Sequence, residues 1–194
     1  MKLYLSTTSP FSRLCLITAL RSGRDLDLQF VLPWENPAEL LAVNPYSQIP
    51  ALVLDNGDVL TETLIIMDHL NKAVLAENNP KLSFGMATLQ QVVKTFTLQL
   101  HGDGEHPHPH IQRANEALAR AFRLAPLLEA DGDHWGDIVL GNALHYARWR
   151  VPVIFEQNLN LANRQALERF VQRDFMVKTT PEALAAKPAR VSEL

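Results

Sequence analysis

The chain has 194 residues, of which 47% are apolar, and its 18 Lys and Arg against 21 Asp and Glu give a formal net charge of -3. This apolar fraction suits one large folded domain or two small ones and excludes a disordered chain. Because charges of both signs are interspersed along the sequence, we expect no nucleic-acid partner. No run approaches about 18 apolar residues and the first residues lack the pattern of a signal peptide, so we expect no membrane partner and a cytoplasmic protein.

The part of the chain before residue 76 predicts strands that alternate with helices. The hydrophobic periods place strands at residues 2–5, 26–32, 51–54 and 59–60 and helices at 11–21 and 63–74. Two strands joined by a helix form a parallel βαβ unit. Asn56-Gly57 lies between the last two strands and predicts a β-hairpin, because both residues tolerate positive φ. The predicted order is βαβ and then ββα.

The chain after about residue 81 has helical periods, at residues 86–100, 111–130, 137–149 and 161–175. The polar segment Glu77-Asn78-Asn79-Pro80 has no apolar period and predicts a linker. The tail from Thr179 is rich in Ala, Pro and charge, so we expect it to be loosely held. The predicted fold class is α/β plus all-α: a thioredoxin-like βαβ-ββα domain at residues 1–76, a linker at 77–83 and an all-helical bundle domain at 84–194.

Ser9-Pro10-Phe11-Ser12 lies between the first strand and the first helix, where a thioredoxin-like fold carries Cys-x-x-Cys. Both cysteines are replaced by serine, which excludes disulfide exchange. A helix N-terminus stabilises negative charge, and the Ser9 hydroxyl can donate a hydrogen bond to the sulfur of a bound thiol. The alternative is that Ser9 only caps the helix.

Two further segments could hold a ligand with peptide and amino-acid groups. Ile49-Pro50 precedes a strand, and a cis bond there would expose the backbone of Ile49 for pairing, whereas an ordinary trans proline is the alternative. Glu62 offers a carboxylate for a ligand ammonium, and the Thr63 hydroxyl with the helix N-terminal N–H groups suits a ligand carboxylate. The alternative is a capping threonine with a first-turn glutamate.

Taken together and in this order, these segments resemble the N-terminal domain of the glutathione S-transferase family, of the bacterial serine type with a Ser-Pro-Phe start. The resemblance runs from Lys2 to about Val74 and includes the Asn-Pro-x-x-x-Ile-Pro-Ala-Leu run that begins at Asn44. It implies that Ser9 is the catalytic residue, which activates the sulfur of glutathione. The glutathione-binding residues that it implies are Phe11, Trp34, Gln48, Ile49, Pro50, Glu62 and Thr63.

Within that implied set, Ile49 pairs with the cysteinyl backbone of glutathione next to a cis Pro50. Glu62 and Thr63 hold the γ-glutamyl end. Gln48 and Trp34 lie near the glycyl carboxylate.

The resemblance also implies an activity. The chain would be an enzyme of detoxification, a glutathione transferase that conjugates the thiolate of glutathione, its co-substrate, to a small hydrophobic electrophile held by the helical domain. It would be a homodimer with no metal. The alternatives are a non-catalytic scaffold that keeps the fold as a binding module, and a glutathione-dependent peroxidase.

Three other features bear on the chemistry. The stretch from His101 to His110 holds four of the seven histidines, but its alternating prolines favour an extended, solvated loop over a metal site. Cys15 is the only cysteine, which excludes an intrachain disulfide and fits a reducing compartment, and we expect it to fill core space. His134 departs from the family, which has Ser or Thr three residues before Asp137 as part of a capping box.

Overall fold

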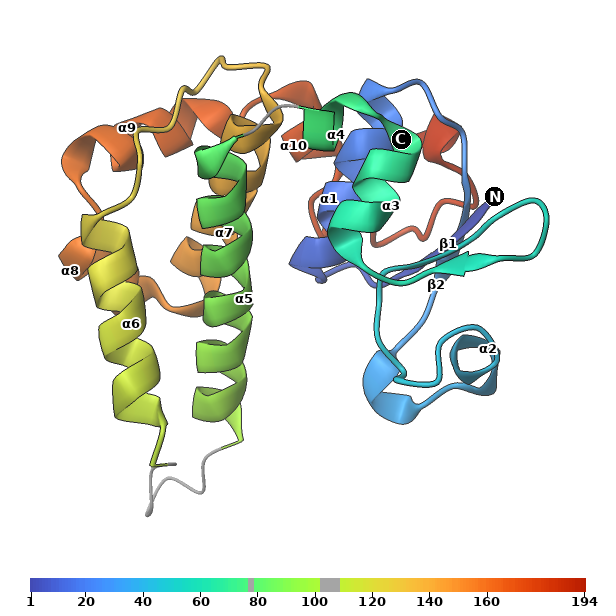
Figure 1. Ribbon diagram of the computed structural model, residues 1–194, viewed down its shortest axis with the longest axis horizontal. Helices are drawn as coiled ribbons and strands as arrows, with labels where there is room; N and C mark the ends of the chain where they lie inside the picture. The colour runs from blue at the N-terminus through green and yellow to red at the C-terminus, as the bar shows by residue number, and fades with distance from the viewer. Residues whose placement is uncertain (77–78, 102–108) are drawn as a thin grey trace. The chain divides into compact units, whose positions relative to one another are not determined.

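The computed structural model describes the whole chain except residues 77–78 and 102–108 (Figure 1). It divides into two compact units. Unit 1 comprises Met1–Asn78 and Arg173–Leu194, and unit 2 comprises Asn79–Gln172. The C-terminal residues therefore belong to the first unit, whereas the sequence assigned them to the helical domain.

Unit 1 contains a four-stranded mixed sheet with the strand order β2-β1-β3-β4. The strands are β1 (Lys2–Leu5), β2 (Asp27–Phe30), β3 (Ala51–Val53) and β4 (Val59–Leu60). β1 is parallel to β2 and antiparallel to β3, which is in turn antiparallel to β4. The predicted order of βαβ and then ββα is confirmed.

Helices cover both faces of this sheet. They are α1 (Pro10–Arg21), α2 (Ala38–Leu41), α3 (Thr63–Leu70) and α4 (Ala73–Ala76), with a short 3-10 helix η1 (Pro33–Glu35). Tyr4 and Ala51 are register partners and pack with Leu40 of α2. Leu3 and Leu52 are also partners and are fully buried on the opposite face, because neighbouring strand residues alternate between faces. α1 and α3 pack against each other, as Figure 1 shows.

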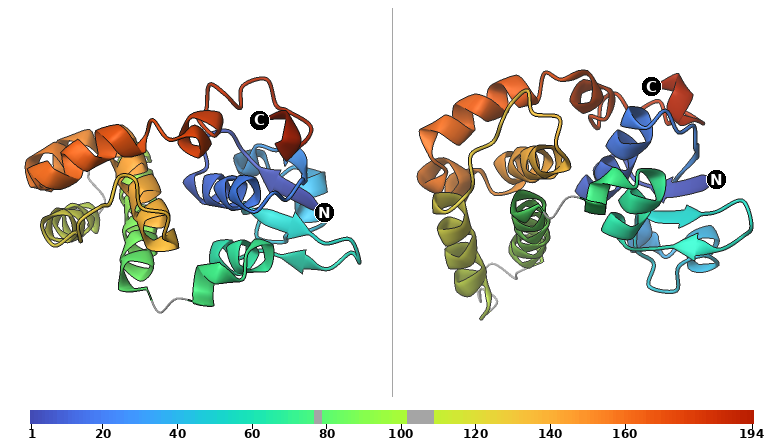
Figure 2. Two further views of the ribbon diagram at one scale, coloured as in Figure 1. Left: turned by 90° about the horizontal axis from the view of Figure 1, so that it is seen from above. Right: turned by 45° about the horizontal axis from the view of Figure 1, so that its top comes forward.

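The C-terminal segment is bound to the edge of this sheet and is not loosely held. It contains α10 (Asp174–Lys178) and a 3-10 helix η2 (Val191–Glu193), and it lies next to the start of the chain (Figure 2). The Leu28 N–H donates to the carbonyl of Ala189 at 2.8 Å, and the Val191 N–H donates to the carbonyl of Leu26 at 3.1 Å. The expectation of a loose tail is wrong, because β2 offers an open edge whose backbone groups the tail satisfies.

A buried arginine holds this segment to α1. The Arg13 side chain donates from Nε to Thr179 Oγ1 at 3.0 Å and from Nη2 to the carbonyl of Met176. Burial lowers the pKa of Arg13 to about 10, although the charge of Glu182 opposes this shift. The guanidinium therefore remains charged at neutral pH, and its donors are used within unit 1.

Unit 2 is helical. Its helices in the described residues are α5 (Pro80–Leu100), α6 (Ile111–Arg123), α7 (Trp135–Arg150), α8 (Pro152–Asn158) and α9 (Leu161–Phe170). α7 is buried along most of its length and packs against α5. A Cβ on Gly85 of α5 would lie 2.8 Å from the backbone nitrogen of Leu140, so this glycine permits the close approach of the two helices. No helix among the described residues has the length and apolarity that a membrane crossing requires.

The start of α5 falls inside the predicted linker. Asn79 is the N-cap of α5, and its Oδ1 accepts from the N–H of Lys81 at 3.0 Å and from that of Leu82 at 3.3 Å. Pro80 occupies the first turn, where a missing N–H costs nothing. Asn-Pro here begins a helix, so the part of the linker that the structure describes is the helix N-terminus. Residues 77–78 lie outside the described residues.

Three predicted helices are too long. The one expected over 63–74 is divided into α3, which ends at Leu70, and α4, which begins at Ala73. The one expected over 111–130 ends at Arg123, because Pro126 follows and disfavours helical backbone at the residue before it. The one expected over 161–175 is divided into α9 and α10, which belong to different units.

A buried carboxylate organises the start of α7. His134 occupies the N-cap, so the hydroxyl of the family capping box is absent. Asp137 is 2% exposed, and its Oδ1 accepts from Lys81 Nζ at 2.7 Å and from the Glu129 N–H at 2.8 Å. Asp137 thus connects α5, the segment before α7 and α7 itself without the usual hydroxyl.

Candidate functional site

Three segments of unit 1 meet at one end of the strands of the sheet, and the strand register brings them there. β1 ends at Leu5 and leads into α1, while its antiparallel partner β3 begins at that end, since Tyr4 pairs with Ala51. β4 is antiparallel to β3, with Leu52 opposite Leu60, so it ends beside the start of β3 and leads into α3. One end of the sheet therefore carries the N-terminus of α1, the residues before β3 and the N-terminus of α3.

Ser9 begins α1. Its backbone is extended, and its Oγ accepts from the Ser12 N–H at 3.2 Å, so it is the N-cap of the helix. The capping role is confirmed. It leaves the proton of the Ser9 hydroxyl available to donate, because a hydroxyl both accepts and donates. The catalytic role stays a prediction.

The loop before β3 presents the open backbone of Ile49. The peptide bond between Ile49 and Pro50 is cis. The N–H and C=O of Ile49 make no hydrogen bond to any residue in the described part of the chain. Pro50 is buried, and the carbonyl of Gln48 accepts from Asn44 Nδ2 at 2.8 Å. A ligand with a peptide backbone can pair with Ile49 without displacing a protein group.

Asn44 is a positioning residue to which the sequence reading gave no role. It is 1% exposed, and besides donating to Gln48 its Oδ1 accepts from the Tyr46 N–H at 3.2 Å. An Asn before Pro is a known turn signal, because the short amide mimics a backbone group. That signal was present in the Asn44-Pro45 pair and could have identified the residue that holds this loop.

Glu62 and Thr63 begin α3. Glu62 is the N-cap and is exposed, and within the described residues its carboxylate forms no ion pair. Thr63 is the first helical residue and is 6% exposed. The free N–H groups of this first turn and the positive end of the helix dipole favour an anion, while the Glu62 carboxylate favours a cation. The two ends of an amino-acid group match this pair.

The other predicted ligand residues lie at the surface near this end of the sheet. Phe11 is half-buried on α1, and Gln48 is exposed directly before Ile49. Trp34 is 81% exposed on η1, and the Ser47 Oγ–H donates to the carbonyl of Pro33 at 3.0 Å, which ties η1 to the loop that carries Gln48. The contacts of Phe11, Gln48 and Trp34 with a ligand stay predictions.

Cys15 does not belong to the site. It is fully buried on α1, and burial raises the pKa of its thiol far above the ordinary value. A buried neutral thiol is a poor nucleophile, because the thiolate is the reactive form. The position agrees with the expectation that Cys15 fills core space.

The raised pKa of Cys15 predicts a loss of stability at alkaline pH. Above about pH 8.5 the thiol of the unfolded chain loses its proton while the folded protein keeps it, so the free energy of unfolding should fall by roughly 1.4 kcal/mol per pH unit. Urea unfolding at pH 7.5, 8.5 and 9.5 in reductant measures this slope. Cys15→Ala should make the slope shallower by about that amount, and equal slopes in the two proteins would contradict the assignment.

The histidine-rich stretch from His101 to His110, which we expect to be a solvated loop rather than a metal site, lies partly outside the described residues. His106 and His108 lie in the segment 102–108, which is outside the described residues. Elsewhere in the described chain, no group of three or more His, Cys, Asp or Glu side chains is placed to hold a metal ion.

Unit 1 has the strand order and helix placement of a thioredoxin-like domain, and a helical domain follows it. A thioredoxin-like domain followed by helices defines a class of two-domain proteins. The profile described as "Glutathione S-transferase, N-terminal domain" matches residues 8–73. The glutathione S-transferase GstA of Escherichia coli O157:H7 is 44% identical over 62 residues, which cover 30% of this chain and 31% of that relative. The chain thus matches about a third of that curated relative.

Solved structures extend the similarity in fold to both domains. A glutathione transferase family member from Pseudomonas fluorescens Pf-5, with bound glutathione, matches with a TM-score of 0.75 at 24% identity, covering 93% of this chain and 98% of that one. A glutathione S-transferase from Methylobacterium radiotolerans, in complex with glutathione sulfonate, matches with a TM-score of 0.76 at 20% identity, covering 93% and 94%. Residues 8–73 thus match the N-terminal domain of the glutathione S-transferase family, and the fold is that of solved glutathione transferases.

Proposed function

We propose that unit 1 binds glutathione and that the protein is a glutathione transferase, which conjugates the thiolate of glutathione to a hydrophobic electrophile. The observation that carries this proposal is the open backbone of Ile49 between the N-termini of α1 and α3. Glutathione is a peptide with a thiol at its centre and an amino-acid group at one end, so it needs a backbone partner, a thiolate-stabilising group and a zwitterion site. The family match and the ligands named for the similar structures support this choice.

In the proposed complex, Ile49 pairs with the cysteinyl backbone of glutathione. The Glu62 carboxylate accepts from the γ-glutamyl ammonium, and the Thr63 hydroxyl with the first N–H groups of α3 donates to the γ-glutamyl carboxylate. Gln48 and Trp34 lie toward the glycyl carboxylate, and Phe11 lies beside Ser9 on α1. Pro50 is buried, and its peptide bond with Ile49 is cis.

In this complex, the Ser9 hydroxyl donates a hydrogen bond to the sulfur of glutathione. Since its Oγ already accepts from the Ser12 N–H, its own proton is available to the sulfur of glutathione. A free thiol titrates near pKa 8.5, so about one unit of lowering, roughly 1.4 kcal/mol, makes the thiolate a major species near neutral pH. The hydroxyl and the N-terminal dipole of α1 supply this stabilisation without a fixed cation.

The remaining parts of the proposal concern the whole protein. The helical domain would hold a small apolar electrophile, and the protein would act in detoxification as a homodimer. The single cysteine is consistent with a reducing compartment, and we place the protein in the cytoplasm.

Calorimetric titration with reduced glutathione at neutral pH tests the proposal. We expect saturable binding of one glutathione per chain. Glu62→Gln should weaken it about tenfold, because a hydrogen bond to a charged group contributes roughly 1.5–3 kcal/mol and this carboxylate is exposed. Glu39→Gln, the same change at an exposed position of α2, is the matched control and should leave the affinity unchanged.

Two results would contradict the proposal. No heat and no thermal stabilisation at millimolar glutathione would reject the binding site and favour the scaffold. Equal weakening by Glu62→Gln and Glu39→Gln would show a general charge effect and remove Glu62 from the site.

A further inference from the structure

We propose that Arg150, the last residue of α7, belongs to a site in unit 2 that selects an electrophile whose aromatic ring carries a carboxylate. This inference rests on the proposed function, because it names the class of electrophile that the helical domain would hold. The site consists of Arg150 and the three aromatic side chains around it, Phe96, Tyr146 and Trp149, and we call it the Arg150 cluster.

Helix spacing and helix packing assemble the Arg150 cluster. Trp149 and Arg150 follow Tyr146 by three and four residues, so all three lie on the same side of α7. Phe96 belongs to α5, which packs against α7. The Arg150 Cζ atom lies 3.5 Å from the ring centroid of Trp149, 4.5 Å from that of Phe96 and 5.5 Å from that of Tyr146. All three distances are in the range of cation–π contacts.

The positive charge of Arg150 has no acidic partner within the part of the chain that the structure describes. Its Nε is buried and makes no hydrogen bond to a described residue. Burial raises the pKa of the Tyr146 phenol although the charge of Arg150 opposes this shift, so the phenol is neutral at neutral pH and does not balance the guanidinium. A half-buried cation without a counter-ion favours an anion as its ligand.

The exposure of the Arg150 cluster indicates a flat ligand. Tyr146 is buried, and its ring meets that of Trp149 edge to face with the centroids 6.0 Å apart. Trp149 itself is 46% exposed and offers apolar surface to an aromatic ring. The guanidinium of Arg150 beside it can donate to both oxygens of a carboxylate. An aromatic ring that carries a carboxylate therefore matches both groups.

The carboxylate of such an electrophile is held, and the reaction takes place at another atom of the ring. With a chlorodinitrobenzoate, the thiolate sulfur of glutathione forms a bond to the ring carbon that bears chlorine. The carbon–chlorine bond breaks, and chloride leaves with its electron pair. The carboxylate is unchanged throughout, so Arg150 contributes to binding and specificity and transfers no proton.

Calorimetry with naphthoate, an aromatic carboxylate that does not react with thiols, tests the site on the full chain without glutathione. We expect saturable one-to-one binding of naphthoate, and naphthylmethanol, which has the same rings without the charge, should bind about tenfold more weakly. Arg150→Gln should weaken naphthoate binding about tenfold for the same reason. Arg169→Gln, which removes the same charge from an exposed position on α9, should change it less than twofold.

Conjugation measures the selectivity directly. The ratio of kcat/KM for chlorodinitrobenzoate to kcat/KM for chlorodinitrobenzene should fall about tenfold in Arg150→Gln and stay within twofold in Arg169→Gln. Circular dichroism checks that each variant is folded. Trp149→Leu is a second variant at the more exposed position and should weaken the binding of both naphthoate and naphthylmethanol.

Three outcomes would overturn the inference: no saturable binding of naphthoate, equal affinities for naphthoate and naphthylmethanol, or equal effects of Arg150→Gln and Arg169→Gln. A cluster that only packs α5 against α7 would lower the stability of Arg150→Gln and leave the kcat/KM ratio unchanged, which would also overturn it. Binding of glutathione without binding of naphthoate rejects this inference alone. Binding of naphthoate without binding of glutathione rejects the proposed function and retains the Arg150 cluster as a site for aromatic carboxylates.

Discussion

Replacing Ser9 with alanine should lower turnover with an aromatic model electrophile by roughly ten- to a hundredfold, while the dissociation constant for glutathione changes less than threefold. The hydroxyl of Ser9 is expected to donate to the thiolate, and a hydrogen bond to a charged group contributes about 1.5–3 kcal/mol. Each 1.4 kcal/mol corresponds to a tenfold change in rate. Steady-state kinetics combined with calorimetry separates this effect on chemistry from an effect on binding.

The pH dependence distinguishes thiolate stabilisation from a structural role. In Ser9→Ala the apparent pKa of bound glutathione should rise toward its free value near 8.5, so the rate should recover as the pH increases. Ser9→Thr keeps a hydroxyl and should retain most of the activity. An unchanged rate in Ser9→Ala would remove Ser9 from the mechanism.

Ser9→Ala also removes the N-cap of α1. Its hydrogen bond with the Ser12 N–H is lost, which should cost about 1 kcal/mol of stability. Urea unfolding of Ser9→Ala measures this cost. The kinetic comparison is then made at a temperature where both proteins are folded.

Replacing Asp137 with alanine should lower the free energy of unfolding by about 3–5 kcal/mol. Asp137 is buried and accepts from both Lys81 Nζ and the Glu129 N–H. Its removal leaves an ammonium that is only 20% exposed without its closest partner and a backbone donor without an acceptor. Urea unfolding monitored by circular dichroism gives the free energy.

Neighbouring variants make this result specific. Glu129→Ala removes a carboxylate that lies 3.5 Å from the same ammonium but is 68% exposed. We therefore expect this change to lower the free energy of unfolding by less than about 0.5 kcal/mol. Lys81→Met combined with Asp137→Ala should cost less than the sum of the single changes, because the two groups interact directly. A loss below about 1 kcal/mol in Asp137→Ala would contradict the role of this carboxylate.

Local signals account for what could be predicted in unit 1. Strand alternation, the Asn56-Gly57 turn and the serine before α1 each act within a few residues, and all lead to the observed elements. The joint spacing of Ser9, Ile49-Pro50 and Glu62-Thr63 was sufficient to predict a resemblance to the glutathione S-transferase N-terminal domain, whose family model matches residues 8–73. In contrast, Asn79-Pro80 was ambiguous, because the same pair suits a linker or the first turn of a helix.

Long-range contacts account for the features that could not be predicted from the sequence. Arg13 meets Thr179, and Arg190 forms ion pairs with Asp25 and Asp27 at 2.8 and 2.7 Å, across more than 160 residues of sequence. No local period encodes such pairings, since they depend on which open strand edge the chain end reaches.

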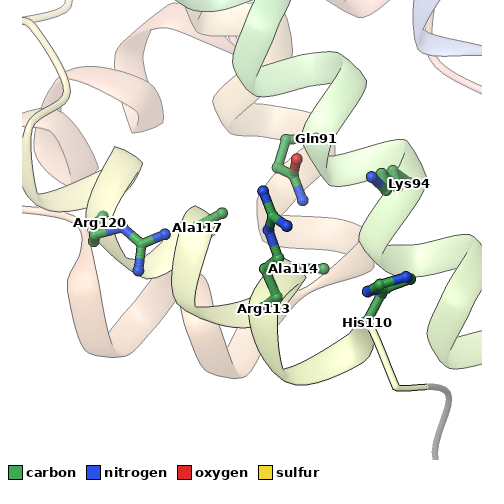
Figure 3. Close-up of a pocket in the computed structure, with 7 residues that line it drawn as sticks. All are labelled: Gln91, Lys94, His110, Arg113, Ala114, Ala117 and Arg120. Atoms are coloured by element: carbon green, nitrogen blue, oxygen red, sulfur yellow. The ribbon is translucent and has the colours of Figure 1, made fainter.

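The same reason applies to the buried Asp137–Lys81 pair and to a pocket between α5 and α6 that Gln91, Lys94 and Arg113 help to line (Figure 3). Residues such as Lys94 and Arg113 are ordinary surface cations in the sequence, and helix packing alone brings them together. The amino-acid sequence specified the elements of unit 1 and the residues of its proposed glutathione site through neighbouring residues. Folding in three dimensions specified the anchoring of the C-terminus, the ion pair at α7 and the pocket between α5 and α6, because each joins groups that are distant along the chain.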